Sequence, residues 1–392
     1  MLDTATLPDT LPLLADLIAI NSENPGGSEA EIVGFCAALL QRHGISSEIV
    51  EVQPGRPNLI ARLEGRNDRK IIYQAHLDTK PAFHAGADAD AWTRPPFHPT
   101  REGDRLYGLG ACDTKGGAAA QLVAMIRLAQ TWSRDMPTLE WQGVADEENG
   151  SLYGAEHLCE SGALEADFAV IAEPTDGRVS FEQMGSIWVD ITVEGEQCHG
   201  GMPWLGADAM TAGLELIEVM KAAVAQRERH PAVRFHPDVG IRILEGGGHA
   251  GTVAGHLRIV SDIRVRPDED REDYRALWQQ AAAQICDRHN VRIGIGEAAG
   301  GGCEPHGLKD ASLRRTIESA WLDEFGQALE PSFFYGGSDA RYFARVGTPA
   351  IVFGAGSLAH AHAPDEFVPV DEVLQCERFL SRLPRALARQ WA

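Results

Sequence analysis

Basic residues are scarce in this chain. Its 35 lysines and arginines stand against 57 aspartates and glutamates, which gives a formal charge of −22 over 392 residues. Nucleic acids and anionic membranes are bound by Lys and Arg that neutralise phosphate charge, so the composition argues against both kinds of partner. The acidic excess fits solubility alone, and it fits equally well carboxylates gathered around metal ions.

Paired cysteines and long apolar runs are also missing. The seven cysteines are odd in number, scattered, and include no Cys-x-x-Cys pair, which fits neither a disulfide framework nor a zinc ribbon. Nowhere do ~20 uncharged apolar residues run together as a bilayer span requires. The N-terminal segment has no basic start, and Asp16 interrupts its apolar run, so no signal peptide is expected. We therefore expect a cytoplasmic protein.

The chain is longer than one hydrophobic core usually fills, because cores stop growing near ~250–300 residues, so two domains are expected. A Ser28-x-x-Glu31 capping box predicts a helix that Gly44 ends, and a helical stretch follows Lys115. Short apolar β-rich runs occur at 70–75, 139–144, 168–172 and 350–353. Near-continuous apolar strands separated by helices predict an α/β fold with a mostly parallel sheet covered on both faces.

The pattern changes between about residues 186 and 297. Strand, helix, strand, strand, helix and strand follow one another there, which is the order of a ferredoxin-like α+β unit. We therefore predict an inserted domain at 186–297 and a discontinuous larger domain at 1–185 and 298–392.

Acidic residues and histidines follow the predicted buried strands. The residues concerned are His76, Asp78, Asp146, Glu147, Glu148, Glu173 and His362, and Asp113 lies in a glycine-rich loop. In open α/β sheets, ligands bind beyond the carboxyl ends of the strands, so these side chains are expected to converge. A single His-x-Asp after a strand is more often a surface turn, but five such groups at matching strand ends favour a common site.

Two imidazoles and several carboxylates form a ligand set for a divalent ion, with Zn²⁺ as the first choice and Mn²⁺ or Co²⁺ as alternatives. Because the set has no thiolates, it predicts a catalytic rather than a structural site. Glu147 and Glu148 are adjacent in sequence, and neighbouring side chains on an extended chain point to opposite sides. One of them can therefore bind metal while the other serves as a base toward water.

The chain resembles the M20 metallopeptidase family, which includes acetylornithine deacetylase, succinyl-diaminopimelate desuccinylase, aminoacylase and carboxypeptidase G2-like enzymes. The resemblance runs in order through nearly the whole chain, in the segments AHLDTKPA, WTRPPFHP, LYGLGACDTKGG, ADEENGS, AEPT, EGEQCHGGMP, SDIRVRP, GGSDARY and HAPDEF. It implies a zinc-hydrolase catalytic domain that carries an inserted lid and dimerisation domain.

By position, the resemblance implies a site with two metal ions. His76 and Glu173 would hold one ion, Glu148 and His362 the other, and Asp113 would bridge them. Asp78 would orient His76, and Glu147 would be the general base. The resemblance also implies a cis peptide at Asp113–Thr114. His360 competes with His362 for the ligand role, but only His362 fits the His-x-x-Asp-Glu spacing, as HAPDE.

Other residues are assigned by the resemblance to substrate recognition. His199 matches a histidine that reaches the partner subunit's active site, and Arg264 matches an arginine that binds a substrate carboxylate. From the sequence alone, an exposed histidine at a strand end is the favoured interpretation of His199, and an arginine on the solvent face of a strand is the alternative for Arg264. Gly337 and Ser338 are expected at the pocket floor, and Gly356 is expected to offer backbone contacts.

Two segments depart from the family pattern. The lid has Gly-Thr-Val-Ala at 251–254, where relatives often have Asn-Val-x-Pro. Lys80 stands four residues after His76, where small or apolar residues are frequent in relatives. Both departures concern the surroundings of the site and leave the metal ligands unchanged.

The favoured function is that of a homodimeric, metal-dependent amidohydrolase acting on an N-acyl amino acid, of the deacetylase or desuccinylase type. A dipeptidase, a carboxypeptidase or an aminohydrolase would use the same metal centre with a different scissile bond. A non-catalytic binding protein of the same fold is a third interpretation, which the complete set of ligands and base argues against.

Overall fold

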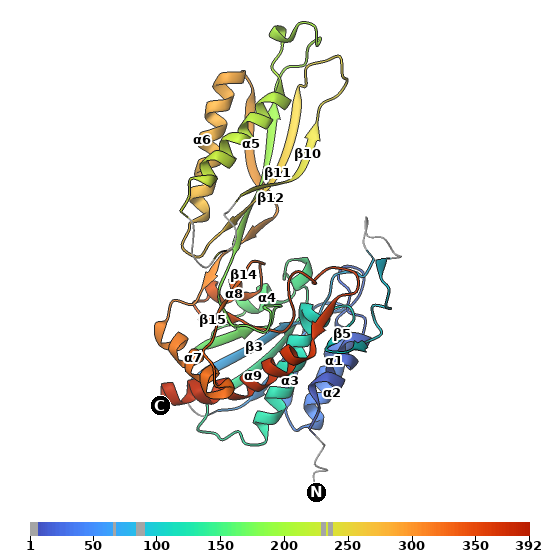
Figure 1. The fold of residues 1–392 in the computed structure, drawn as a ribbon, viewed down its shortest axis with the longest axis vertical. Coiled ribbons are helices and arrows are strands. Elements are labelled where there is room, and N and C mark those ends of the chain that lie inside the picture. The colour runs from blue at the N-terminus through green and yellow to red at the C-terminus, as the bar shows by residue number, and fades with distance from the viewer. Residues whose placement is uncertain (1–6, 66–67, 84–90, 229–232, 234–237) are drawn as a thin grey trace. The chain divides into compact units, whose positions relative to one another are not determined.

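The computed structural model describes residues 7–65, 68–83, 91–228, 233 and 238–392 (Figure 1). The chain forms two compact units, the first from Met1–Glu182 with Gly307–Ala392 and the second from Gln183–His306. We call them the larger unit and the inserted unit. The insertion predicted at 186–297 falls within the second of them.

The larger unit contains a nine-stranded sheet. Its main path runs in the order β1 (Ser46–Gln53), β2 (Arg56–Leu63), β6 (Thr138–Val144), β3 (Lys70–His76), β7 (Phe168–Ile171), β15 (Ala350–Val352), β8 (Ser180–Gln183) and β13 (His306–Gly307), and β14 (Ser332–Phe334) pairs with β8. The central strands β6, β3, β7 and β15 are parallel to one another. Their carboxyl ends therefore meet at one edge, as predicted for a mostly parallel sheet.

Helices cover both faces of this sheet. Successive side chains of a strand point to opposite faces, so the same strands supply apolar residues to both layers of helices. Ile71, Tyr73 and Trp141 are buried on the face that packs against α1 (Thr10–Ala19), α2 (Ala30–Arg42), α3 (Gly116–Ala129), α7 (Ala311–Phe325) and α9 (Val370–Trp391). Ile72 and Val144 are buried on the opposite face with residues of α4 (Ala155–Glu160) and α8 (Ala340–Arg345). The result is a three-layer α/β/α arrangement, in which α3 and α9 pass in front of β3 in Figure 1.

A small three-stranded sheet lies outside these layers. It has the order β16 (Phe367–Pro369), β5 (Arg105–Tyr107) and β4 (Thr100–Glu102). None of the helices in the described ranges is both long enough and apolar enough to cross a membrane.

The capping box predicted at the start of α2 is wrong. The helix begins at Ala30 with Glu29 as its N-cap residue. The Ser28 hydroxyl accepts a hydrogen bond from the Ala30 N–H at 3.0 Å and donates to the carbonyl of Gly55 at 2.9 Å. Ser28 therefore ties the helix start to the β1–β2 turn, and this tertiary contact moves the cap by one residue.

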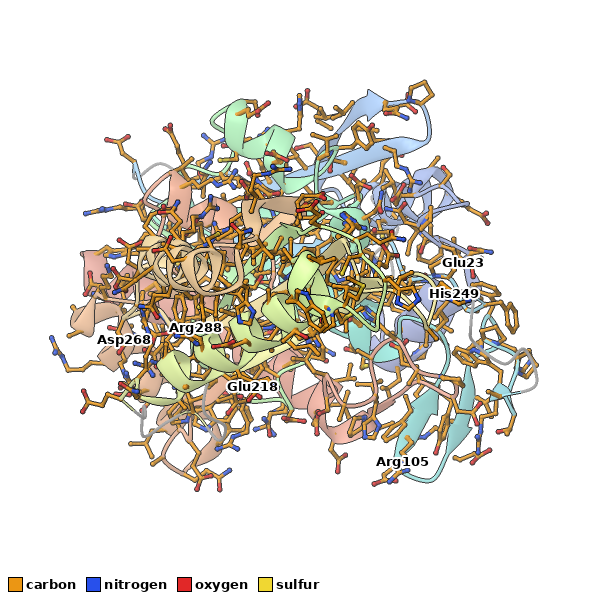
Figure 2. All side chains as sticks on the ribbon, turned by 90° about the horizontal axis from the view of Figure 1, so that it is seen from above. Glu23, Arg105, Glu218, His249, Asp268 and Arg288 are labelled. Carbon is orange, nitrogen blue, oxygen red and sulfur yellow. The ribbon has the colours of Figure 1, made fainter. Side chains whose placement is uncertain are left out.

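The inserted unit has the predicted ferredoxin-like element order, β9 (Gly185–Glu194), α5 (Ala209–Ala225), β10 (Val239–Gly246), β11 (His256–Val265), α6 (Arg271–His289) and β12 (Arg292–Cys303). Its antiparallel sheet runs β10-β11-β9-β12. Ile187, Ile191 and Ile259 are buried with residues of both helices, which are marked in Figure 2 by Glu218 on α5 and Arg288 on α6. The helices thus cover one face of this sheet.

Candidate metal centre

The carboxyl ends of three neighbouring parallel strands bring the predicted ligands together. His76 is the last residue of β3, Glu147 and Glu148 form a short turn after β6, and Glu173 follows β7. Ligand atoms of His76, Glu147 and Glu173 all lie within 4.8 Å of one another. Side chains 97 positions apart along the chain therefore face a common point.

A second group of side chains that could bind a metal ion lies next to the first, and we call the two sets the donor groups. Asp113, Glu148 and His362 also have ligand atoms within 4.8 Å of one another, and His362 Nε2 lies 3.0 Å from Glu148 Oε1. Asp113 joins the two groups. Its Oδ1 is 3.1 Å from His76 Nε2, and its Oδ2 is 3.2 Å from His362 Nε2.

The loop that carries Asp113 is held in place by Glu366. The carboxylate of Glu366 accepts hydrogen bonds from the backbone N–H groups of Gly110, Cys112 and Asp113 at 3.1, 2.9 and 3.1 Å. The peptide after Asp113 is cis, as expected from the resemblance. Glu366 stands four residues after His362. One short segment therefore supplies a candidate metal ligand, His362, and also positions the carboxylate of Asp113.

Asp78 lies beneath the first donor group. His76 Nδ1 is 3.0 Å from the backbone oxygen of Asp78 and 3.5 Å from its Oδ1, so the backbone oxygen is the nearer acceptor for the ring. The Asp78 carboxylate instead accepts hydrogen bonds from the N–H groups of Glu147 at 3.2 Å and Glu148 at 3.1 Å, and from Asn24 Nδ2 at 3.0 Å. Asp78 therefore orients both the imidazole and the acidic turn.

Charge crowding shifts the ionisation of these groups. Burial lowers the pKa of His76, but its hydrogen bonds to Asp113 and Asp78 outweigh burial and hold that pKa well above the ordinary value. Burial raises the pKa of Glu147 to about 8, and burial followed by the charge of Asp113 raises the pKa of Glu173 well above its ordinary value. When several carboxyl groups share one buried space, the ionised form of each is disfavoured by burial and by the negative charge of the others, unless cations offset that charge.

The donor set fits divalent ions. Glu173 Oε1 is buried and has no hydrogen-bond partner among the described residues, although an unsatisfied buried carboxylate oxygen is costly. Two imidazoles and four carboxylates, with no thiolate, match the ligands of catalytic Zn²⁺, Mn²⁺ or Co²⁺ sites. Positive ions between the two groups would satisfy this oxygen and offset the crowded negative charge.

The other predicted residues of the larger unit lie around the centre in different ways. His360 is exposed and its ring packs on Phe367 with 4.3 Å between centroids, in keeping with the loop role assigned to it. Ser338 is buried, its hydroxyl accepts from the Ala340 N–H at 3.2 Å, and Gly337 precedes it in the segment between β14 and α8. The Gly356 N–H donates to Glu372 Oε2 at 2.8 Å, so the backbone donor predicted to contact substrate is already engaged within the protein.

His199 and Arg264 belong to the inserted unit. The backbone N–H of Gly201 donates to His199 Nδ1 at 3.0 Å, which leaves the proton of a neutral ring on Nε2. Thr252, in the Gly-Thr-Val-Ala departure, pairs with His199 as an isolated β-bridge. Arg264 lies on β11 with its Nη2 3.4 Å from the buried carboxylate of Asp262.

Sequence reasoning missed two residues that organise the centre. Asn24 joins Asp78 and Asp146 through its amide, with distances of 3.0 and 2.9 Å, and it precedes a cis proline bond to Pro25. Its Asn-Pro pair was the available signal, since such pairs mark turns. The role of Glu366 was visible only as part of HAPDE, because backbone hydrogen bonds leave no pattern in the sequence.

The α/β/α layering and the two donor groups at the strand ends define a class, that of hydrolases with a metal-ligand set and an inserted α+β domain. A sequence model of the peptidase family M20/M25/M40 matches residues 72–386. The chain belongs to this family, whose members hydrolyse amide and peptide C–N bonds, and it is a hydrolase of this kind.

Named relatives span almost the whole chain. A probable succinyl-diaminopimelate desuccinylase of Staphylococcus epidermidis is 26% identical over 395 residues and covers 93% of this chain and 94% of its own length. An acetylornithine deacetylase of Vibrio campbellii is 27% identical over 392 residues, with 96% of this chain and 98% of its own covered.

Solved structures show the same fold. The aminopeptidase PepT of Bacillus cereus has a TM-score of 0.77 at 21% identity, covering 97% of this chain and 98% of its own. The YXEP protein of Bacillus subtilis, a dinuclear metal-binding peptidase, has a TM-score of 0.74 at 16% identity with the same coverage. The fold expectation from the sequence is therefore confirmed.

Proposed function

We propose that this protein is a dinuclear-metal amidohydrolase that removes the acyl group from an N-acyl amino acid or a similar small carboxylate. The observation that carries the proposal is the position of Asp113, whose two carboxylate oxygens face His76 and His362 in the two donor groups. We assign His76 and Glu173 to one ion, Glu148 and His362 to the other, and Asp113 to both. Zn²⁺ is the first choice, with Co²⁺ or Mn²⁺ as alternatives.

Divalent ions, when bound, supply Lewis-acid chemistry that acidifies water and polarises a carbonyl group. In this proposal Glu147 takes the proton from the attacking water on its carboxylate and later gives it to the leaving nitrogen. Its carboxylate lies beside His76 and Glu173 without being needed as a ligand in this assignment, which suits a group that takes up and releases a proton. Asp78 holds the Glu147 backbone, so the base keeps its place while the proton moves.

The inserted unit completes this proposal. His199 would donate from Nε2 to the developing oxyanion, which requires the tautomer that the Gly201 N–H favours. We infer that it acts across a homodimer formed through the inserted unit. Arg264 would bind the substrate carboxylate with its planar fork of donors. The proposed location remains the cytoplasm.

The test compares Glu147→Gln with Glu160→Gln, a control at the exposed end of α4. We expect Glu147→Gln to keep its metal content, measured by elemental analysis, and to lose about 10³-fold in kcat, because general base catalysis supplies effects of that order. The control should match the unaltered protein. Loss of metal with loss of activity would instead make Glu147 a ligand, and unchanged turnover would refute its role as base.

Substrate class is tested separately with N-acetyl amino acids, N-succinyl amino acids and dipeptides. Preferential, chelator-sensitive hydrolysis of the acylated amino acids is expected. Cleavage of dipeptides alone would support a peptidase with the same centre. Absence of chelator-sensitive hydrolysis would favour a non-catalytic protein.

A further inference from the structure

Lys80 contacts Glu148 in three places. This lysine stands in the loop after β3, and its backbone N–H donates to Glu148 Oε1 at 3.3 Å. Its Nζ lies 3.4 Å from Glu148 Oε2 and also donates to the Glu148 carbonyl oxygen. The Glu148 side chain is only 4% exposed, against 33% for Lys80. An ammonium group thus reaches inward to a buried carboxylate.

The same carboxylate belongs to the second group of metal-ligand side chains, Asp113, Glu148 and His362, which we call the outer donor group. The first group, His76, Glu147 and Glu173, is the inner donor group. Glu148 Oε1 lies 3.0 Å from His362 Nε2, and Glu148, Asp113 and His362 are the side chains that converge there. The Lys80 ammonium lies nearest Glu148 Oε2, whereas His362 faces Oε1, so a divalent ion at this position and the ammonium would share one carboxylate group. They also carry charge of the same sign, so each weakens the attraction of Glu148 for the other.

The inner donor group is different. Its members, His76, Glu147 and Glu173, are more buried as a group, whereas the side chain of His362 in the outer group is 45% exposed. Glu173 Oε1 has no hydrogen-bond partner within the described part of the chain. In the inner group, therefore, an incoming cation finds a carboxylate oxygen with no competing donor.

We propose that Lys80 is a built-in competitor for the outer divalent ion. It weakens the ion held by Asp113, Glu148 and His362 relative to the ion of the inner group, so that occupancy of the outer position follows the supply of free metal. This inference rests on the proposed two-ion centre. When the outer ion binds, the ammonium leaves the Glu148 carboxylate and keeps its contact with the carbonyl oxygen.

The test is metal binding itself, independent of turnover. Metal-free protein is titrated with Co²⁺, and uptake is followed by visible absorption and by calorimetry. Lys80→Met removes the charge and keeps the length of the side chain, Lys80→Arg keeps the charge, and Lys309→Met removes one charge from an exposed position just before α7.

In the unaltered protein we expect two affinities that differ. Lys80→Met should tighten the weaker one about 10-fold, since one nearby charge is removed from a poorly solvated position, and should leave the stronger one unchanged. Lys80→Arg and Lys309→Met should leave both unchanged. A gain in affinity is not a result that misfolding can produce.

Four results would overturn the proposal. If Lys80→Met changes neither affinity, or shifts both equally as a general charge effect would, Lys80 is not a competitor for the outer ion. If the unaltered protein binds two ions with equal affinity, this inference fails while the two-ion function stands. If it takes up no ion at all, both proposals fail.

Discussion

The carboxylate of Asp78 accepts a hydrogen bond at 3.1 Å from the backbone N–H of Glu148. Its other oxygen accepts from the preceding N–H of the turn, that of Glu147, at 3.2 Å. One buried side chain after β3 therefore fixes the turn after β6 that presents both acidic residues. Asp78 thus sets the geometry of the proposed base, Glu147, and of the candidate ligand Glu148, although Asp78 itself need not touch metal or substrate.

Asp78→Asn should impair catalysis through this turn. The amide replaces one of the two accepting oxygens with a donor, so one of the N–H groups of Glu147 and Glu148 loses its partner. We expect kcat to fall about 10–100-fold, the usual range for residues that orient metal ligands, with a smaller change in KM. Steady-state kinetics with metal-saturated protein measures this split.

The control for Asp78→Asn is Asp104→Asn, at an exposed position between β4 and β5. It makes the same chemical change and should leave kcat and KM unaltered. If Asp78→Asn changes KM alone, Asp78 acts on substrate binding and the positioning role is wrong.

Much of this site could be predicted from the sequence, for a physical reason. The central strands β3, β6 and β7 are short, largely apolar runs, and each ends at or within two residues of its polar site residues, so strand assignment alone places those residues at one edge of the sheet. His362 is different. It comes ten residues after β15 and has a positive φ of 58°, and only the family spacing of HAPDE pointed to it.

The contacts that could not be predicted are those made by backbone groups and by long-range side-chain pairs. The N-cap of α2 moved by one residue because Ser28 bonds to Gly55. The hold of Glu366 on the Asp113 loop joins residues 253 positions apart through a backbone N–H. No residue type or spacing in the sequence predicts such hydrogen bonds before the fold is known.

Glu29 predicts a pH dependence of stability. This residue is fully buried beside Arg56, at 2.6 Å, and burial followed by the charge of Asp78 raises its pKa from 4.5 to about 7. Between these two values the folded protein keeps a proton that the unfolded chain has lost. The free energy of unfolding therefore falls as pH rises from about 4.5 to about 7, by about 3 kcal/mol for this residue, and stays level above.

Glu29→Gln should remove that slope. The free energy of unfolding of the variant minus that of the unaltered protein, from urea titrations at pH 5, 6, 7 and 8, should increase with pH and level off above about 7. Glu31→Gln, at an exposed position in the first turn of α2, is the control and should show no such trend. A difference that stays constant with pH would mean that Glu29 ionises normally in the folded state.

Asp262 offers a test of carboxylate recognition in the inserted unit. Its buried carboxylate lies 2.7 Å from Arg242 Nη2 and 3.4 Å from Arg264 Nη2. Asp262→Asn removes the charge that orients both guanidinium groups. For a substrate with a free carboxylate we expect KM to rise about tenfold with little change in kcat, because charge-assisted hydrogen bonds are the interaction at stake.

The comparison substrate for Asp262→Asn has the same carboxylate blocked as an amide, and its KM should not change. Arg258→Gln serves as a control, since Arg258 is on the same strand but pairs with Asp190 at 2.7 Å. An equal rise in KM for the free and the blocked substrate would show a general disturbance of the sheet rather than a lost carboxylate contact.

Metal removal should destabilise the larger unit, and Glu173 should determine by how much. Ions that bind only the folded state stabilise it by RT ln(1 + [L]/Kd), about 4 kcal/mol at a thousandfold excess over Kd, so a chelator should lower Tm by roughly 5–10 °C for a protein of this size. Adding Zn²⁺ back should restore the Tm.

Glu173→Gln tests the contribution of one ligand to this stabilisation. In the variant, the buried oxygen that has no partner among the described residues becomes part of a weak amide ligand. The Zn²⁺-dependent rise in Tm, measured by differential scanning fluorimetry, should then fall to less than about half, while the metal-free Tm stays within about 2 °C. A full Zn²⁺-dependent rise in Glu173→Gln, equal to that of the Glu160→Gln control, would remove Glu173 from the metal centre.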